Sequence, residues 1–194
     1  MTLKDIMNHL KSKGWDCKRD QIGDRYAIKE FEGLQIQLLP ILDKRKNYIV
    51  FSLAPSLSLK QYSEICALLM EEKNDFEPLI SRYGWPKLSL EMDSFPQKEF
   101  EELSLANIDS LEIEAMEWAR KQDINKAIEY YANLPTDSAG SLPLNHLAAL
   151  IIQKNKEQLE YYKQSFIEGN RLGFVPYITD KVINRAVQLA NSKQ

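Results

Sequence analysis

The sequence has few of the residues from which most cofactor sites are built. Its 194 residues include 7 Gly, 2 Cys and 2 His. Neither a Gly-x-Gly motif nor a Gly-Lys-Ser or Gly-Lys-Thr motif occurs, which excludes the usual dinucleotide fingerprint and the usual phosphate-binding loop. Two cysteines are too few for a disulfide scaffold or a cysteine-rich zinc module. We therefore expect no nucleotide, no metal and no other cofactor.

Long hydrophobic runs are also missing. The longest uninterrupted aliphatic run spans residues 147–152, and the charged pair Lys4 and Asp5 stands where a signal peptide would need an apolar stretch. A membrane-spanning helix needs about 20 predominantly apolar residues. We therefore expect neither export nor membrane insertion. We place the protein in the cytoplasm, where two free thiols are ordinary.

The first half of the chain combines helical and β-type periodicity. Thr2 and Asp5 form a helix-start pattern, and apolar residues then recur at helical spacing until Gly14. Four β-rich runs follow, at residues 15–19, 26–31, 34–42 and 48–54. They predict an antiparallel meander with one covered face and one partly wet face. Pro40 predicts a bulge or an edge in the third strand.

Two further elements are expected next to the meander. A capping-box pattern at residues 58–61 precedes an apolar stripe that runs to Met70, which predicts a second helix packed on the sheet. Residues 87–92 could form a fifth strand after the turn at residues 84–86.

Beyond Pro96 the β-rich runs disappear and helical patterns take their place. They cover residues 99–106, 110–122, 124–133, 144–153, 156–168 and 180–190. Residues 115–131 match residues 146–162 weakly, and both copies end in Glu-Tyr-Tyr, which is typical of stacked helical hairpins. Helical spacing turns one ring of each Tyr-Tyr pair inward and the other outward.

These patterns predict an α+β fold in two parts. Residues 1–95 form an N-terminal antiparallel β-meander with flanking helices, and residues 96–194 form an all-helical half of stacked helical hairpins. The only candidate linker, residues 93–97, is short and contains Phe95, so we expect the parts to pack together as one unit.

Candidate catalytic residues are scarce. His9 and His146 each lie on a predicted helix without a second ligand at metal-site spacing, so we interpret both as structural or solvent-facing. There is no Gly-x-Ser-x-Gly motif of the kind that carries the nucleophile of serine hydrolases. Cys66 lies on an apolar helix stripe, so we interpret it as a small core residue. Carboxylates are plentiful, which leaves a hydrolase with two catalytic acids open.

Charge is distributed unevenly along the chain. Between Glu71 and Glu117 there are thirteen Asp and Glu against four Lys and Arg, although the whole chain has a net charge of only −3. Two explanations fit such an acidic block equally: solvated helix faces, or a docking surface for a basic partner. On the second interpretation we expect a partner-binding surface formed by Glu91, Asp93, Glu99, Glu101, Glu102, Asp109 and Glu112.

Two family resemblances follow from this organisation. A small acidic chain without catalytic motifs, with an α/β first half and a helical second half, resembles the bacterial immunity proteins that neutralise contact-dependent growth-inhibition toxins. The opening segment at residues 3–15, the meander and the helix after Ser58 also resemble the α-β-β-β-α layout of type III secretion chaperones. The helical half departs from that layout.

The immunity resemblance implies a non-catalytic inhibitor that forms a tight complex with a cognate toxin domain, often a nuclease. Its partner would be a basic protein, with no direct contact to nucleic acid or membrane. A secretion-chaperone-like effector binder and an uncharacterised hydrolase are the alternatives. The oligomeric state is left open by the sequence.

Overall fold

The computed structural model describes residues 1–20, 23–73, 76–82 and 98–192. The chain divides into two compact units, which we name the sheet unit and the helical unit. The sheet unit consists of Met1–Ser58 and Ile80–Gln122, and the helical unit of Leu59–Leu79 and Asp123–Gln194. An antiparallel sheet dominates the first and helices make up the second, so the predicted α+β class is confirmed.

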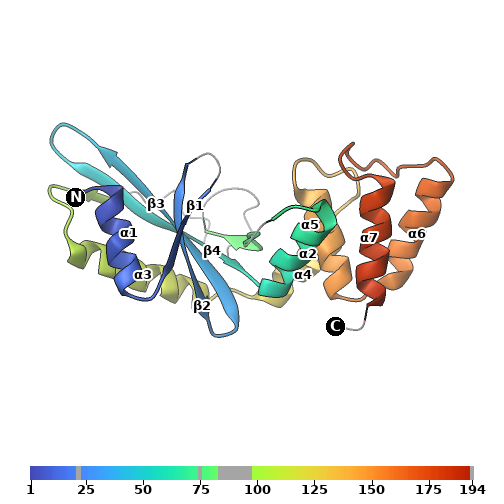
Figure 1. Cartoon of the computed structure of the whole chain (residues 1–194), viewed down its shortest axis with the longest axis horizontal. Coiled ribbons are helices and arrows are strands. Elements are labelled where there is room, and N and C mark those ends of the chain that lie inside the picture. Colours follow the sequence, from blue (N-terminus) through green and yellow to red (C-terminus); the bar gives the residue numbers. More distant parts are fainter. Residues whose placement is uncertain (21–22, 74–75, 83–97, 193–194) are drawn as a thin grey trace. The chain divides into compact units, whose positions relative to one another are not determined.

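The secondary-structure elements follow one another along the chain as labelled in Figure 1. The sheet unit contains α1 (Leu3–Ser12), β1 (Asp16–Arg19), β2 (Arg25–Phe31), β3 (Leu34–Lys44), β4 (Ile49–Ser58), β5 (Ile80–Ser81), β6 (Lys98–Phe100) and α3 (Leu105–Arg120). The helical unit contains α2 (Lys60–Met70), α4 (Ile124–Ala132), α5 (Leu142–Ile152), α6 (Lys156–Ile167) and α7 (Asp180–Asn191).

The sheet is the predicted antiparallel meander. Strands β1 to β4 pair with their chain neighbours, and the two short strands β5 and β6 both pair with β4. Ile36 and Leu38 of β3 are fully buried, whereas Gln35 and Gln37, which alternate with them, are only partly covered. The expected contrast between a covered face and a partly wet face is therefore confirmed.

Pro40 lies in β3 where that strand has a single neighbour among the described strands. The β2 pairing extends only from Leu34 to Leu38, whereas the β4 pairing runs from Gln35 to Lys44 without a break. A residue without an N–H costs no ladder hydrogen bond on an unpaired edge. The predicted edge is confirmed, and the register contains no bulge at Pro40.

Helices α1 and α3 cover the sheet. The N-cap of α1 is the predicted Thr2, whose side chain and that of Asp5 form a reciprocal capping box. This orients the buried residues Ile6, Met7 and Leu10 toward β1, β2 and β3, while α3 packs on β4 and also contacts α1. The core of the sheet unit thus lies between these two helices and one face of the sheet.

Helix α2 belongs to the helical unit, which corrects the expectation that it packs on the sheet. Its buried side chains Tyr62, Ile65 and Leu69 lie in a helix that contacts α5 and α7. Arg185 of α7 also donates hydrogen bonds to the carbonyl oxygen of Leu69, from Nε at 2.9 Å and from Nη2 at 2.6 Å. These bonds satisfy a carbonyl at the end of α2 that the helix itself leaves free.

Two local predictions were wrong for the same reason. Ser58 is the last residue of β4 rather than a helix cap, and α2 begins after Leu59 without a side-chain cap. The helix expected at residues 99–106 forms only from Leu105 onward, as the start of α3, and β6 with a short loop takes the place of its first six residues. In both places, pairing with a distant strand overrides the local helical pattern. The expected strand at 87–92, the linker at 93–97 and the boundary at 95/96 lie outside the described residues.

Candidate functional site

Three of the expected partner-binding carboxylates form one exposed segment, which we name the acidic loop: Glu99, Glu101 and Glu102. The segment is held at both ends. Glu99 and Phe100 pair with Val50 and Ile49 of β4. At the other end Leu103 is buried and Ser104 caps α3 through a reciprocal box with Asn107. The acidic loop therefore projects from a fixed frame into solvent.

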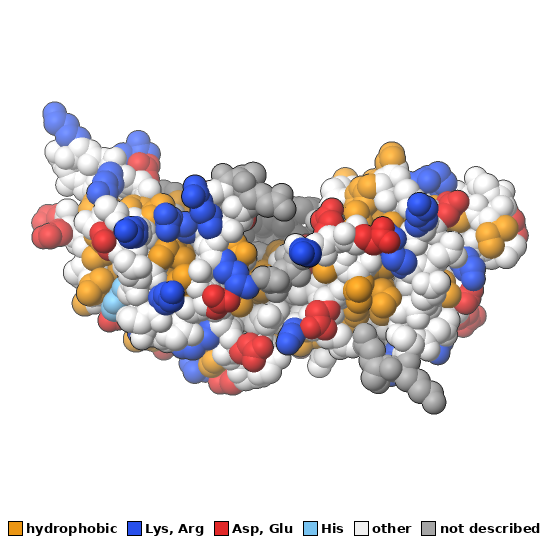
Figure 2. All heavy atoms as spheres, viewed as in Figure 1, with side chains coloured by type: hydrophobic (Ala, Val, Ile, Leu, Met, Phe, Trp, Pro, Cys, Tyr) orange, Lys and Arg blue, Asp and Glu red, His pale blue; other side chains and the backbone are white. Residues whose placement is uncertain are grey.

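A group of basic residues lies next to the acidic loop. Lys44, Arg45 and Lys46 are exposed in the β3–β4 turn, and β6 pairs with β4 directly after this turn. Figure 2 shows Lys and Arg side chains interspersed with Asp and Glu on the visible face of the sheet unit. The negative potential of the acidic loop is consequently local, because neighbouring opposite charges screen it at longer range.

Asp109 and Glu112 occupy a different environment from the acidic loop. Asp109 accepts hydrogen bonds from His9 Nε2 at 2.6 Å and from Lys13 Nζ at 2.8 Å. Glu112 accepts one from Lys13 and one from the Trp15 indole N–H at 2.8 Å. Because these residues stand three apart on α3, both carboxylates face α1 and the segment that follows it.

The pKa shifts of Asp109 and Lys13 follow from the contacts of this network. Hydrogen bonds from Lys13 and His9 lower the pKa of Asp109. Burial acts against the charged form of Lys13, but its bonds to Asp109 and Glu112 outweigh this and raise the pKa of Lys13. Glu112 is only 7% exposed, so it is not available as part of an open docking surface. Its expected exposure is corrected, and Asp109 is already engaged on one side.

Glu114 is another acidic residue of the α3 segment that has basic partners inside the unit. It bonds to Lys98 of β6 at 2.5 Å and to Arg82 at 3.4 Å. Burial alone would raise the pKa of Glu114, but the Lys98 and Arg82 contacts outweigh it and the pKa is lowered. The acidic excess of the sequence is therefore partly neutralised within the fold. Glu91 and Asp93 lie outside the described residues.

Sequence reasoning missed two exposed apolar side chains of α3. Leu105, at the start of α3, is 48% exposed, and Ile113 is 57% exposed. Ile113 shares a helix stripe with Ala106, Ser110 and Glu117, all of them exposed. An isoleucine at a position where the helical period expects a polar residue was the signal that could have identified it.

The two Tyr-Tyr pairs behave as helical spacing predicts. Tyr131 and Tyr162 are buried, while Tyr130 and Tyr161 are exposed. His146 of α5 contacts both buried tyrosines: its Nδ1 is 2.9 Å from the backbone carbonyl oxygen of Tyr131, and its Nε2 is 2.9 Å from the Tyr162 hydroxyl. The carbonyl can only accept, so Nδ1 carries the proton and Nε2 accepts from Tyr162. His146 is a structural residue, as expected.

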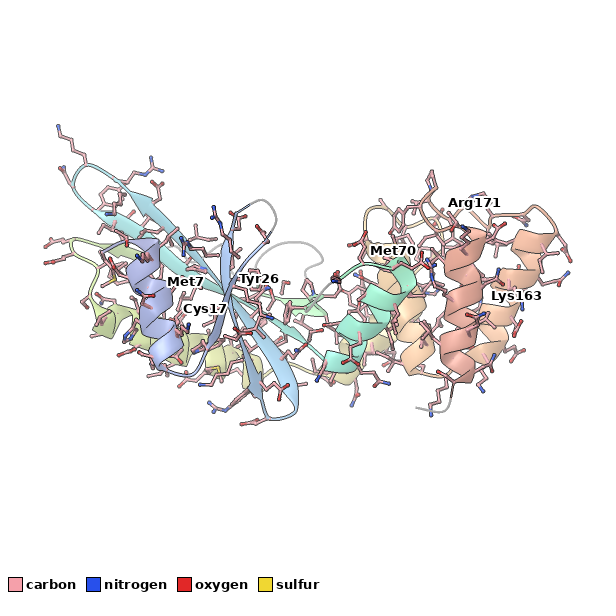
Figure 3. All side chains as sticks on the ribbon, in the orientation of Figure 1. Met7, Cys17, Tyr26, Met70, Lys163 and Arg171 are labelled. Carbon is pink, nitrogen blue, oxygen red and sulfur yellow. The ribbon has the colours of Figure 1, made fainter. Side chains whose placement is uncertain are left out.

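The thiols show no sign of activation. Cys66 is buried in α2, and burial raises the pKa of its thiol. Cys17 lies on β1 beside Met7 of α1, and its Sγ donates to the carbonyl oxygen of Met7 at 3.3 Å (Figure 3). Burial also raises the pKa of Cys17, so thiolate is disfavoured at both positions. Within the described ranges, no three His, Cys, Asp or Glu side chains are grouped as a metal site would require.

Comparisons with known proteins bear on the family. In the described part of the chain, no helix combines the length and apolar character needed to cross a membrane. No curated protein and no solved structure matches the chain. A family model does match it, over residues 2–191. Because that match covers almost the whole sequence, the chain belongs to DUF6990, a family of unknown function.

Proposed function

We propose that this protein is a non-catalytic binding protein of the immunity type, which inhibits a cognate bacterial toxin by forming a tight complex with it in the cytoplasm. The observation that carries the proposal is the acidic loop. Its three carboxylates are exposed, and among the described residues none of them forms a salt bridge. Exposed carboxylates at a fixed position set the register of an oppositely charged partner at close range.

Exposed apolar side chains of α3 supply the apolar contact that charge alone does not give. Leu105 directly follows the loop and its cap, and Ile113 lies on the solvent-facing stripe of α3. Interfaces derive most of their affinity from a few desolvated side chains, while peripheral charges set the association rate. We therefore place Leu105 and Ile113 in the contact and the acidic loop at its edge.

The proposed partner is a toxin domain with a basic surface, such as a nuclease that binds phosphates. Exposed carboxylates would occupy the positions that phosphate groups otherwise take. The secretion-chaperone alternative has weaker support, because four strands rather than three separate α1 from α2, and α2 belongs to the helical unit. The proposal assigns no catalytic residue.

The test reverses the charge of the acidic loop. Candidate toxin domains are taken from genes that neighbour this gene in its native host. The variant Glu99→Lys/Glu101→Lys/Glu102→Lys should lose protection of cells that express the toxin domain neutralised by the wild type. It should also bind that toxin domain more slowly and with a weaker salt dependence, because exposed charges act through steering. Folding should be retained, since each surface substitution changes stability by about 0.5 kcal/mol or less.

The matched control reverses three exposed carboxylates of the helical unit, Glu64, Glu129 and Glu157. It has the same change in net charge and should keep both protection and association rate. Equal loss in the two variants would mean that only net charge matters. Full protection by the acidic-loop variant would refute the proposed docking site.

A further inference from the structure

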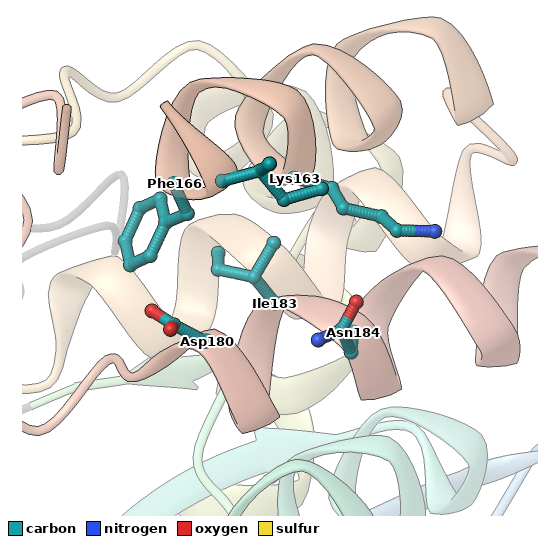
Figure 4. A pocket seen from close by; sticks show the side chains of 6 residues that line it. Lys163, Phe166, Asp180, Ile183 and Asn184 are labelled. Atoms are coloured by element: carbon teal, nitrogen blue, oxygen red, sulfur yellow. The ribbon is translucent and has the colours of Figure 1, made fainter. Parts of the chain in front are cut away.

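Helices α6 and α7 enclose a hollow of about 120 Å³ on the helical unit (Figure 4). Its lining residues are Lys163, Phe166, Ile167, Asp180, Ile183 and Asn184. Phe166 and Ile183 are buried and form its apolar part. Its volume corresponds to roughly one aliphatic side chain, so it is a receptor for a single apolar group rather than a small-molecule site.

A projecting apolar group lies at the rim of the same hollow. Ile167 is 69% exposed, the highest value among the large hydrophobic side chains of the described residues. It is the last residue of α6, where the chain turns toward α7. The surface therefore carries both a cavity of side-chain size and an exposed aliphatic side chain that fits such a cavity.

Opposite charges stand at the two ends of the hollow. In Figure 4 the Lys163 ammonium and the Asp180 carboxylate point toward opposite ends, with Ile183 between them. The described contacts of Lys163 include only a 3.8 Å ion pair with Glu160, and Asp180 forms no salt bridge within the described ranges. Along the hollow the lining residues therefore follow the order Asp180, apolar side chains, Lys163.

We propose that this surface is an interface between two copies of the chain. A twofold contact brings the same patch of each copy together in opposite directions, so it requires a self-complementary surface. The twofold rotation reverses the order of these residues in the second copy. Lys163 of one copy is thereby placed opposite Asp180 of the other. The same operation directs each exposed Ile167 toward the hollow of the other copy. The inference is independent of the proposed toxin binding, which uses the sheet unit.

Sedimentation velocity of the full chain, from micromolar to submillimolar concentration, tests the proposal. We expect the wild-type chain to form dimers, and Ile167→Glu to raise the dimer dissociation constant by at least about tenfold, as for a central interface residue. Tyr161→Glu is the matched control, because Tyr161 is also an exposed apolar residue of α6 but does not line the hollow. It should dimerise as the wild type does.

A charge exchange tests the twofold arrangement itself. Lys163→Asp and Asp180→Lys should each weaken the dimer, and the double variant Lys163→Asp/Asp180→Lys should restore it, because the exchanged charges again face each other. Circular dichroism establishes that each variant is folded. A wild-type chain that is monomeric at every concentration, an unchanged Ile167→Glu dimer, or a double variant as weak as the single variants would overturn the proposal.

Discussion

At the scale of single residues, acidic side chains of one sequence segment have different roles because their surroundings differ. Glu101 is in solvent, whereas Glu112 is held by Lys13 and Trp15. Those partners lie 99 and 97 positions away in the sequence. Charge counting could predict that the segment is acidic, but no local pattern distinguishes a carboxylate that will be paired from one that will stay exposed.

This difference predicts unequal effects on stability. Glu112→Ala should lower the free energy of unfolding by about 2 to 3 kcal/mol, because it leaves the buried indole N–H of Trp15 without its acceptor and Lys13 without one of its two carboxylates. Glu101→Ala should change it by about 0.5 kcal/mol or less. Urea denaturation of both variants at neutral pH measures the difference. Similar values for the two variants would contradict the internal role of Glu112.

At the scale of elements, prediction succeeded where the determining residues are neighbours in sequence. Helices α1, α4 and α6 have local side-chain caps, whereas α7 begins by helical periodicity without one. All four helices begin where the sequence predicts. Prediction failed at Ser58, which pairs with β3, and at residues 98–100, which pair with β4, because these distant strands decide the local structure. Single-sequence patterns carry no information on such distant pairings.

His146 connects three helices of the helical unit. It lies on α5, bonds to a carbonyl at the end of α4 through Nδ1, and accepts from Tyr162 of α6 through Nε2. The carbonyl oxygen of Tyr131 also accepts from the backbone N–H of Leu134 at 3.2 Å, so His146 adds a second hydrogen bond to a carbonyl at the end of α4. The neutral imidazole matches both partners, and burial lowers the pKa of His146.

A lowered pKa makes stability depend on pH in a defined direction. The folded chain holds His146 neutral, whereas the unfolded chain binds a proton near the ordinary histidine pKa of about 6.5. The stabilisation is complete above that pH and declines as the pH falls through it toward the lower folded value. We expect the difference in Tm between the wild type and His146→Gln to shrink from pH 7.5 to pH 5, as thermal unfolding would show. A constant difference would mean that His146 does not titrate.

At the scale of the whole molecule, the two compact units interleave in the sequence. The chain leaves the sheet unit after Ser58, forms α2, returns at Ile80 and leaves again after Gln122. Composition and periodicity indicated a change from strands to helices along the chain, and that change is real. They could not assign α2 to the later helices, because its apolar stripe would fit a sheet as well as it fits α5 and α7.

The register at the sheet edge shows how the two units could be separated. Leu57 of β4 pairs with Ile80 of β5, and Ser56 pairs with Ser81. The two ends of the α2 excursion therefore lie side by side in an antiparallel pair, at the distance that a short hairpin turn spans. We expect that residues 59–79 can be replaced by Asn-Gly, which together with Ser58 gives a three-residue connection between the paired residues Leu57 and Ile80.

This geometry predicts opposite behaviour for two fragments of the chain. Residues 1–122 retain α2 but lack α5 and α7, so the buried side chains Tyr62, Ile65 and Leu69 would be exposed to water. We expect that fragment to aggregate or to bind a hydrophobic dye.

The second fragment joins Ser58 to Ile80 through Asn-Gly and ends at Gln122. It should be monomeric, with a cooperative thermal transition, since its core lies between α1, α3 and the sheet. Size-exclusion chromatography and dye fluorescence compare the two, and a well-folded 1–122 fragment beside an aggregated joined fragment would show that α2 belongs with the sheet after all.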